Sequence, residues 1–355
     1  MIHVIIPVYN VEKFIEQCVQ SVLKQPYKNI DIVMIDDGST DNSGQICDYI
    51  AAKNKRVSII HQKNKGLSAA RNIGIEFILS KSISNDDYIT FLDSDDAWIP
   101  NTIDASFADE YLSGDVIAFP FYYANSELNR FSQRSISIVG EIDEPRLLTI
   151  WDTPIVVWSS FYKVSLLKGC NIRFQEEVRF GEDVCFNNIV LYYAKSYTAV
   201  DKYYVSYRLH QRSLSNTKGK KRIEPWINII DGLLVGLERF QIKDEEYRQK
   251  TKDLCCWYLL EMSEAYYKSL SISDKPYSFI RTHVLGERYY KRYMNLSQRE
   301  INRISFMLEH KHFFKAKFFL KGIIQYIKRV VLIIQPIRKY YEKRRFPLLQ
   351  NQIIS

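Results

Sequence analysis

Strand and helix signals alternate through the first hundred residues, and this alternation constrains the fold more than any other feature. Four short apolar runs rich in β-branched residues are typical of buried strands: Ile2–Val8, Ile30–Ile35, Val57–Ile60 and Tyr88–Leu92. Between them, apolar residues recur every three or four positions, which predicts helices over Val11–Leu23, Ser43–Lys53 and Leu67–Leu79. The alternation predicts an α/β fold, Rossmann-like, whose mostly parallel sheet is flanked by helices.

The rest of the chain is less regular. One aromatic strand is expected over Ala118–Tyr123, and helices rich in Leu, Ile and Tyr are expected from Glu224 to Leu308. We therefore expect four parts, with boundaries at 1–110, 111–218, 219–310 and 311–355. The third part is a C-terminal helical region and the fourth a basic tail.

The formal net charge of +8 is concentrated near the C-terminus. Residues 311–345 carry eleven of the 49 Lys and Arg and one of the 41 acids, which leaves 38 basic and 40 acidic residues elsewhere. A nearly neutral body argues against nucleic acid as a partner and indicates one localised attraction to something anionic. The six cysteines form no CxxC pair, and the first residues read as a strand, not a signal peptide, so we expect a cytoplasmic protein.

The basic tail also carries an apolar helical face. Its members are Phe319, Leu320, Ile323, Ile324, Ile327, Val330, Val331 and Ile334. Lys321, Lys328 and Arg329 interrupt the apolar sequence, so no stretch is long enough to span a bilayer. This pattern predicts peripheral binding of residues 313–345 to an anionic membrane surface, at the inner face of the cell membrane. Packing on the protein body or on a partner subunit is the alternative.

Polar residues end the first two predicted strands. Pro7 and Tyr9 lie at the end of the first strand, and Asp37 follows the second. A nucleotide base needs an aromatic face for stacking and a fixed acceptor for its ring N–H, which Tyr9 and Asp37 can supply. Strand-ending acids and glycines mostly serve turns, so each residue alone is a weak signal.

The third strand is followed by Asn64-Lys65-Gly66 and a helix that contains Arg71. A helix N-terminus favours a phosphate group, and Arg71 adds a permanent positive charge about one turn in. The alternative is a surface arginine beside an ordinary glycine turn.

An acidic run, Asp93-Ser94-Asp95-Asp96, follows the fourth strand. Its carboxylates repel one another unless a cation is present, and together with diphosphate oxygens they suit Mn2+ or Mg2+. Such an ion would stabilise a diphosphate as a leaving group. A solvated acidic turn is the alternative.

Glu182 and Asp183 stand in a second acidic run, Gly181-Glu182-Asp183-Val184. An aspartate can take the proton of an attacking hydroxyl group. An acidic helix cap is the alternative.

The order and spacing of these runs resemble a known family. PVYN, DDGSTD, NKGLSAARN and DSDD are similar to the donor half of inverting family 2 glycosyltransferases, which have the GT-A fold. FGEDVCF resembles the acceptor-side motif of bacterial members that build capsule, O-antigen or exopolysaccharide. The resemblance covers residues 2 to 215. It implies that residues 1–110 are the nucleotide-sugar donor half of a GT-A domain and residues 111–218 its acceptor half.

The resemblance also implies roles on the donor side. Pro7, Tyr9 and Asp37 would hold the base, and Arg71 would lie near the nucleotide. Asp93, with Ser94 beside it, would approach the ribose or the donor sugar, and Asp95 would ligate the metal.

On the acceptor side, the resemblance makes Asp183 the catalytic base, with Glu182 contacting acceptor or donor hydroxyls. A basic stretch, Tyr207–Arg212, would fold over the diphosphate. Within it, His210 would reach the metal or a phosphate, a surface histidine being the alternative, and Arg212 would add charge. Trp158 would be a platform for sugar stacking, or else a core tryptophan.

The predicted function is transfer of a hexosyl or N-acetylhexosaminyl group from a nucleotide-diphosphate sugar, expected to be a UDP-sugar, to a glycan or lipid-linked glycan. A nucleotidyltransferase would need a glycine-rich basic loop where HVIIPVYN stands, and a dehydrogenase would need GxGxxG after the first strand. A catalytically silent, membrane-docked scaffold of a polysaccharide assembly stays open as an alternative.

Overall fold

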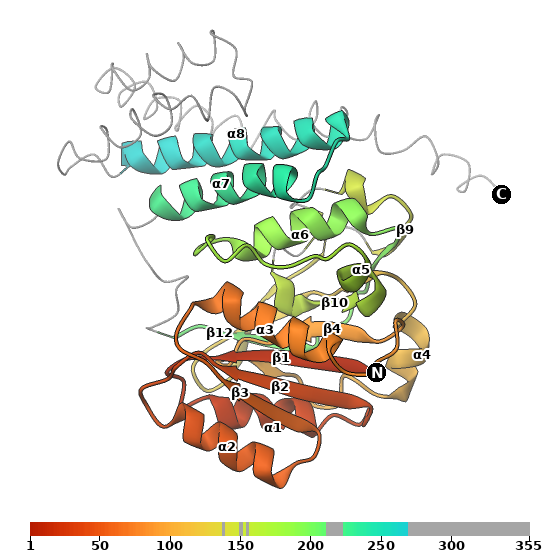
Figure 1. The fold of residues 1–355 in the computed structure, drawn as a ribbon, viewed down its shortest axis with the longest axis vertical. Helices are drawn as coiled ribbons and strands as arrows, with labels where there is room; N and C mark the ends of the chain where they lie inside the picture. Colours follow the sequence, from red (N-terminus) through yellow and green to blue (C-terminus); the bar gives the residue numbers. More distant parts are fainter. Residues whose placement is uncertain (137–138, 149–151, 154–155, 211–222, 269–355) are drawn as a thin grey trace. The chain divides into compact units, whose positions relative to one another are not determined.

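A computed structural model describes residues 1–136, 139–148, 152–153, 156–210 and 223–268. Within these ranges the chain forms an eight-stranded sheet, a four-stranded sheet and flanking helices (Figure 1). The chain divides into two compact units, Met1–Ala265 and Tyr266–Ser355. The expected boundaries after residues 110 and 218 both fall inside the first unit, so the division into four parts stays a prediction.

The first hundred residues form the elements that their apolar pattern predicts. They are β1 (Ile2–Val8), α1 (Ile15–Leu23), β2 (Ile30–Asp36), α2 (Ser43–Lys53), β3 (Val57–His61), α3 (Leu67–Leu79) and β4 (Tyr88–Phe91). Strand β1 is buried along its whole length because parallel strands β2 and β4 lie on its two sides. The predicted α/β core is confirmed here.

Helix α3 lies on the opposite face of the sheet from α1 and α2 (Figure 1). Right-handed crossovers require this, because the chain moves outward from β1 through β2 to β3 and then returns past β1 to β4. Gly74 permits close packing of α3, since a Cβ atom there would overlap the side chain of Ile5 in β1. The N-terminal turn of α3 is thereby held at the carboxyl ends of the parallel strands.

The elements from residue 97 onward extend the same sheet and form a second, smaller one. Its elements are β5 (Ala97–Trp98), α4 (Ala105–Tyr111), β6 (Val116–Ala118), β7 (Phe121–Ala124), β8 (Arg130–Arg134), β9 (Gly140–Ile142), η1 (Pro145–Leu147), η2 (Val157–Ser159), β10 (Ser160–Lys163), α5 (Val164–Gly169), α6 (Glu182–Tyr193), β11 (Tyr197–Ala199), β12 (Val205–Arg208), α7 (Ile223–Arg239) and α8 (Glu245–Lys268). The large sheet has the order β3-β2-β1-β4-β10-β6-β11-β9, and β10 is antiparallel to both of its neighbours. The sheet is therefore parallel in its first half and mixed in its second.

The aromatic strand expected over Ala118–Tyr123 is wrong. Strand β6 ends at Ala118 in the large sheet, and β7 begins at Phe121 in the small sheet, whose order is β5-β12-β7-β8. Pro120 stands between them and lacks the N–H that a ladder needs, so the chain passes from one sheet to the other at this point.

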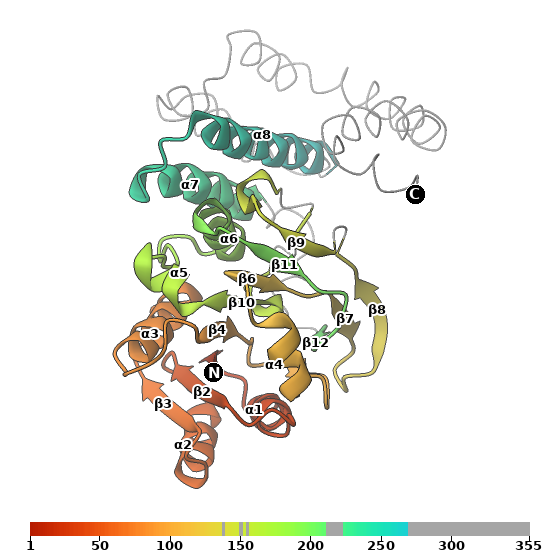
Figure 2. The same cartoon turned by 90° about the vertical axis from the view of Figure 1, so that its right-hand side faces the viewer.

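Helix α7 packs against α6 in the first unit (Figure 2). Gly181, the residue before α6, has φ +70°, and a Cβ atom there would overlap the side chain of Ile229 in α7. Glycine therefore serves both the left-handed backbone and the close approach of the second helix. The start of α6 is fixed by α7.

Across the described part of the chain, no helix is both long enough and apolar enough to cross a bilayer. The basic tail of residues 311–355, with the predicted membrane-binding segment 313–345, lies outside the described residues.

Candidate active site

The loops that follow β1 and β2 are joined by side-chain hydrogen bonds. Asn10 has φ +54°, and its side-chain oxygen accepts from the backbone N–H of Thr40 at 2.8 Å and of Asp41 at 3.3 Å. Pro7 is buried at the end of β1, whereas Tyr9 is 49% exposed. The structure thus leaves the Tyr9 ring available at the sheet edge where a base was expected.

The carboxylate of Asp37 organises the entry to α3. It accepts from the backbone N–H of Lys65 at 2.8 Å, from that of Gly66 at 2.8 Å, and from Nε2 of Gln62 at 2.6 Å. Asp37 is 4% exposed. This structural role was not predicted from the sequence, and its contact with a base stays a prediction.

Asp36, which the sequence analysis did not single out, lies behind these loops. Its carboxylate accepts from the N–H of Ser39 at 3.0 Å and lies 2.8 Å from Nδ1 of His61. Nε2 of His61 lies 2.9 Å from Oδ1 of Asp48. The hydrogen bonds to Asp48 and Asp36 raise the pKa of His61. Burial alone would raise the pKa of Asp36, but hydrogen bonds from Ser39 and His61 outweigh burial and lower it.

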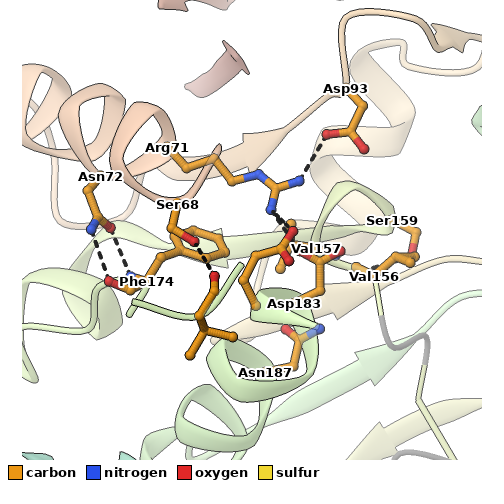
Figure 3. A network of polar contacts seen from close by, with 12 residues as sticks. Ser68, Arg71, Asn72, Asp93, Val156, Val157, Ser159, Phe174, Asp183 and Asn187 are labelled. Atoms are coloured by element: carbon orange, nitrogen blue, oxygen red, sulfur yellow. Dashed lines mark hydrogen bonds and ion pairs between the residues drawn. The ribbon is translucent and has the colours of Figure 1, made fainter. Parts of the chain in front are cut away.

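Arg71 is buried and binds three carboxylates (Figure 3). Its Nη2 lies 2.9 Å from Oδ1 of Asp93, and its Nη1 lies 3.0 Å from Oε1 of Glu182 and 2.7 Å from Oδ1 of Asp183. Burial would lower the pKa of Arg71, but the three carboxylates raise it above its usual range. The alternative of a surface arginine is therefore wrong, because the side chain is 1% exposed.

Glu182 and Asp183 occupy the first turn of α6. Oδ2 of Asp183 also accepts from the N–H of Val157 at 3.4 Å (Figure 3). Burial raises the pKa of Asp183 well above its usual range, while the guanidinium of Arg71 opposes the shift. A raised pKa brings a carboxyl group closer to the working pH of a general base.

Strand β12 is tied to the acidic turn after β4. Oδ1 of Asp96 accepts from the N–H of Arg208 at 2.7 Å, and Nε of Arg208 donates to the backbone oxygen of Asp95 at 2.6 Å. Two residues further on, Nε2 of His210 lies 2.8 Å from Oδ2 of Asp95. Ser94 is buried in the same turn. The structure thus brings together Asp95 and His210, two predicted site residues that are 115 positions apart in the chain.

Asp95 and His210 are the residues of the site that could hold a divalent cation. In the described ranges, no three side chains of His, Cys, Asp or Glu form a metal shell, and Asp93 is turned toward Arg71. Asp95 and His210 are partly exposed and supply one carboxylate and one imidazole. Two protein ligands suit an ion whose remaining ligands are diphosphate oxygens and water, as is usual for Mg2+ bound with phosphates.

Trp158 is placed by the structure in the core. Trp158 is 3% exposed, and its ring stacks on Tyr207 with 5.1 Å between centroids and meets Phe121 edge-on. The ring is packed in an aromatic cluster and offers almost no surface to a sugar. Arg212 lies outside the described residues.

Residues 3–169 match the family model described as glycosyl transferase family 2. This span contains the loops after β1, β2 and β4 and the buried Arg71. Residues 3–169 are therefore similar in sequence to glycosyl transferase family 2.

Three curated proteins are similar to this chain over stretches of different length. EpsJ of Bacillus subtilis, an uncharacterized glycosyltransferase, is 30% identical over 232 residues, which are 63% of this chain and 65% of EpsJ. Glycosyltransferase GlyG of Streptococcus pneumoniae is 42% identical over 132 residues, 36% of this chain and 42% of GlyG. GgaA of B. subtilis, a minor teichoic acid biosynthesis protein, is 30% identical over 246 residues, 64% of this chain and 52% of GgaA. The chain spans less than two thirds of the length of these relatives.

Solved structures confirm the fold of the chain. TarS 1–349 of S. aureus in complex with UDP has a TM-score of 0.61 at 20% identity and covers 91% of each chain. The same protein in complex with UDP-GlcNAc has a TM-score of 0.59 at 22% identity, covering 79% of this chain and 80% of that one. The predicted GT-A type of α/β fold is confirmed by this likeness.

Proposed function

We propose that this chain is an inverting, metal-dependent glycosyltransferase of bacterial surface polysaccharide synthesis. It moves a hexosyl or N-acetylhexosaminyl group from a UDP-sugar to a hydroxyl of a glycan or lipid-linked glycan. The observation that carries the proposal is the meeting of donor-side Asp93 with acceptor-side Asp183 on the guanidinium of Arg71. The name of the relative GgaA supports the pathway, and the UDP-GlcNAc complex of TarS supports the donor class.

On the donor side, the exposed ring of Tyr9 stacks on the base beside Pro7. Asp37 accepts from the ring N–H of the base, because its two oxygens can accept more than the three hydrogen bonds they already receive. Asp93 and Ser94 contact the ribose or the donor sugar. Arg71, expected near the nucleotide, lies directly behind Asp93.

The acceptor side supplies the base. Asp183 takes the proton of an acceptor hydroxyl, and that oxygen attacks the anomeric carbon from the face opposite the diphosphate, which inverts the anomeric configuration. Glu182 orients hydroxyl groups beside it. Asp95 and His210 would hold Mn2+ or Mg2+, and the bound ion would neutralise charge on the departing diphosphate.

A catalytically silent scaffold is the second candidate. It would gain nothing from three carboxylates around one buried guanidinium, an arrangement that costs desolvation energy. We propose that the enzyme lies in the cytoplasm at the inner face of the membrane and is attached through residues 313–345. Nucleic acid is not among its proposed partners.

The test is an assay of the purified full-length chain against UDP-, GDP- and dTDP-sugars with Mn2+ or Mg2+. We expect one donor class to release its nucleoside diphosphate in a metal-dependent reaction, and the anomeric protons of the transferred sugar to show inversion by NMR. Absence of turnover with every donor, together with absence of UDP binding by calorimetry, would favour the scaffold instead.

A further inference from the structure

We propose that Arg71 is a positioning residue for the base, holding Asp183 from the donor side of the site, and that it does not bind the donor's diphosphate. The inference rests on the proposed function, in which Asp183 is the base. It differs from the expected role of Arg71 as a positive charge beside the nucleotide.

The contacts of the guanidinium leave little room for a phosphate. Both terminal nitrogens already donate to carboxylates, and the remaining Nε is buried without a hydrogen-bond partner among the described residues. The rings of Phe174 and Phe91 flank the group, with centroids 5.2 Å and 5.9 Å from Cζ. A diphosphate would have to displace Asp93 or Asp183 to reach it.

The fork shape of arginine suits this position. Nη2 points to Asp93 in the donor half, and Nη1 points to the two acids at the start of α6 (Figure 3). A lysine ammonium is a single point of charge and cannot reach in both directions with fixed geometry. The guanidinium can therefore hold the carboxylates of Asp93 and Asp183 at a fixed distance from each other and balance part of their negative charge.

The turn of α3 that carries Arg71 is itself anchored to the acceptor half. Oγ of Ser68 donates to the backbone oxygen of Val178 at 3.3 Å, and Nδ2 of Asn72 donates to that of Phe174 at 3.0 Å (Figure 3). The N–H of Phe174 returns a bond to Oδ1 of Asn72 at 2.8 Å. The side chain of Arg71 is thus preorganised before any substrate arrives.

Charge explains why Asp183 needs this partner. Asp183 shares one guanidinium with Asp93 and Glu182 in a desolvated site, so burial and repulsion from these carboxylates favour its protonated form. The titratable and charged groups that face Asp183 are Arg71, Glu182, Asp93, Tyr162 and Cys185. Of these, Arg71 is the group that stabilises the ionised base.

The experiment compares Arg71→Met and Arg71→Lys with the wild type in the full-length chain. Turnover, KM for the donor, and UDP affinity by calorimetry are measured across pH. For Arg71→Met we expect kcat to fall by about tenfold or more and the acidic limb of the kcat profile to move to higher pH. KM and the Kd for UDP should change far less than kcat, because Arg71 itself makes no contact with the donor and reaches it only through Asp93. Arg71→Lys should recover part of kcat.

Glu182→Gln gives an independent variant, should Arg71→Met not fold. Removing a negative charge beside Asp183 should move the acidic limb to lower pH. NMR titration of the Asp183 carboxyl carbon measures the same shifts without turnover, so this inference can be judged even if no donor is found and the proposed function fails. A tenfold rise in KM and in Kd for UDP with an unshifted limb would make Arg71 a diphosphate ligand and overturn the inference. Unshifted titration of Asp183 in both variants would overturn it as well.

Discussion

Nη1 of Arg71 lies 2.7 Å from Oδ1 of Asp183, although 112 positions separate the two residues in the chain. The contact joins the N-terminal part of α3 to the first turn of α6, which belong to the proposed donor and acceptor sides of the site. Neither half contains the complete set of candidate catalytic groups. The charge of the proposed base, Asp183, therefore depends on a residue that lies far from it in the sequence.

Replacing Asp183 by Asn should lower kcat about 10²–10⁴-fold, because the amide cannot accept the proton of the acceptor hydroxyl. The fold should persist, since burial already favours the neutral form of this side chain and the amide has the same shape. Turnover and UDP affinity are measured side by side. The exposed Asp109→Asn is the matched control and should behave as the wild type. Wild-type turnover in Asp183→Asn would assign the base elsewhere.

Removal of the metal should stop transfer. Chelation of divalent ions, and the Asp95→Ala variant, should each lower turnover by about 10²-fold or more, because the diphosphate then departs without a neutralising charge. Added Mn2+ or Mg2+ should restore the chelated wild type but not the variant. Turnover that persists in excess chelator would remove Asp95 and His210 from the metal site.

Gly181→Ala should destabilise the protein by roughly 2–5 kcal/mol. An alanine at φ +70° is strained, and its Cβ atom would overlap Ile229. Urea unfolding at fixed pH measures the change. Gly169→Ala is the control, because a Cβ atom there meets nothing within 4 Å, and its effect should stay within about 1 kcal/mol. Equal stability of the two variants would contradict the packing of α7 on the start of α6.

His61 should make stability depend on pH. Its folded-state pKa is raised above the ordinary value of 6.5, so its contribution is fully present below that pH and is lost as the pH rises through the folded pKa. The lowered pKa of Asp36 acts in the acid range, where its contribution is lost as the pH falls. The free energy lost in His61→Gln should thus be larger at pH 5.5 than at pH 8.5. The difference should be small because the side chain is 47% exposed. Equal losses at both pH values would show that His61 does not carry this effect.

Local sequence pattern was enough to predict the strands and helices of the first hundred residues. Strand β1 and helices α2 and α3 have the predicted bounds, because their apolar periodicity and the turn residues around them agree. The Ala118–Tyr123 prediction failed because one apolar run can serve two sheets. Only tertiary pairing shows that the chain changes sheet at Pro120.

The candidate site was predictable as a set of residues but not as a set of contacts. Order along the chain pointed to Asp93, Asp95 and Asp183, yet nothing in their spacing shows that Asp93 turns away from Asp95 toward Arg71. The burial of Arg71 depends on α6, which lies more than a hundred positions later. The bond between Asp96 and Arg208 depends in the same way on the small sheet. An aspartate directly after a strand indicates a functional residue, but the tertiary fold decides which side chains it contacts.

The fit between Gly181 and Ile229 limits how this protein can be recombined with its relatives. A chimera that takes α6 from one parent and α7 from another would join two helix surfaces whose side chains do not fit each other. The mismatch would lie beside Asp183, the proposed base. Successful exchanges of acceptor specificity should therefore transfer both helices as one cassette, with crossover points before Gly181 and after Arg239.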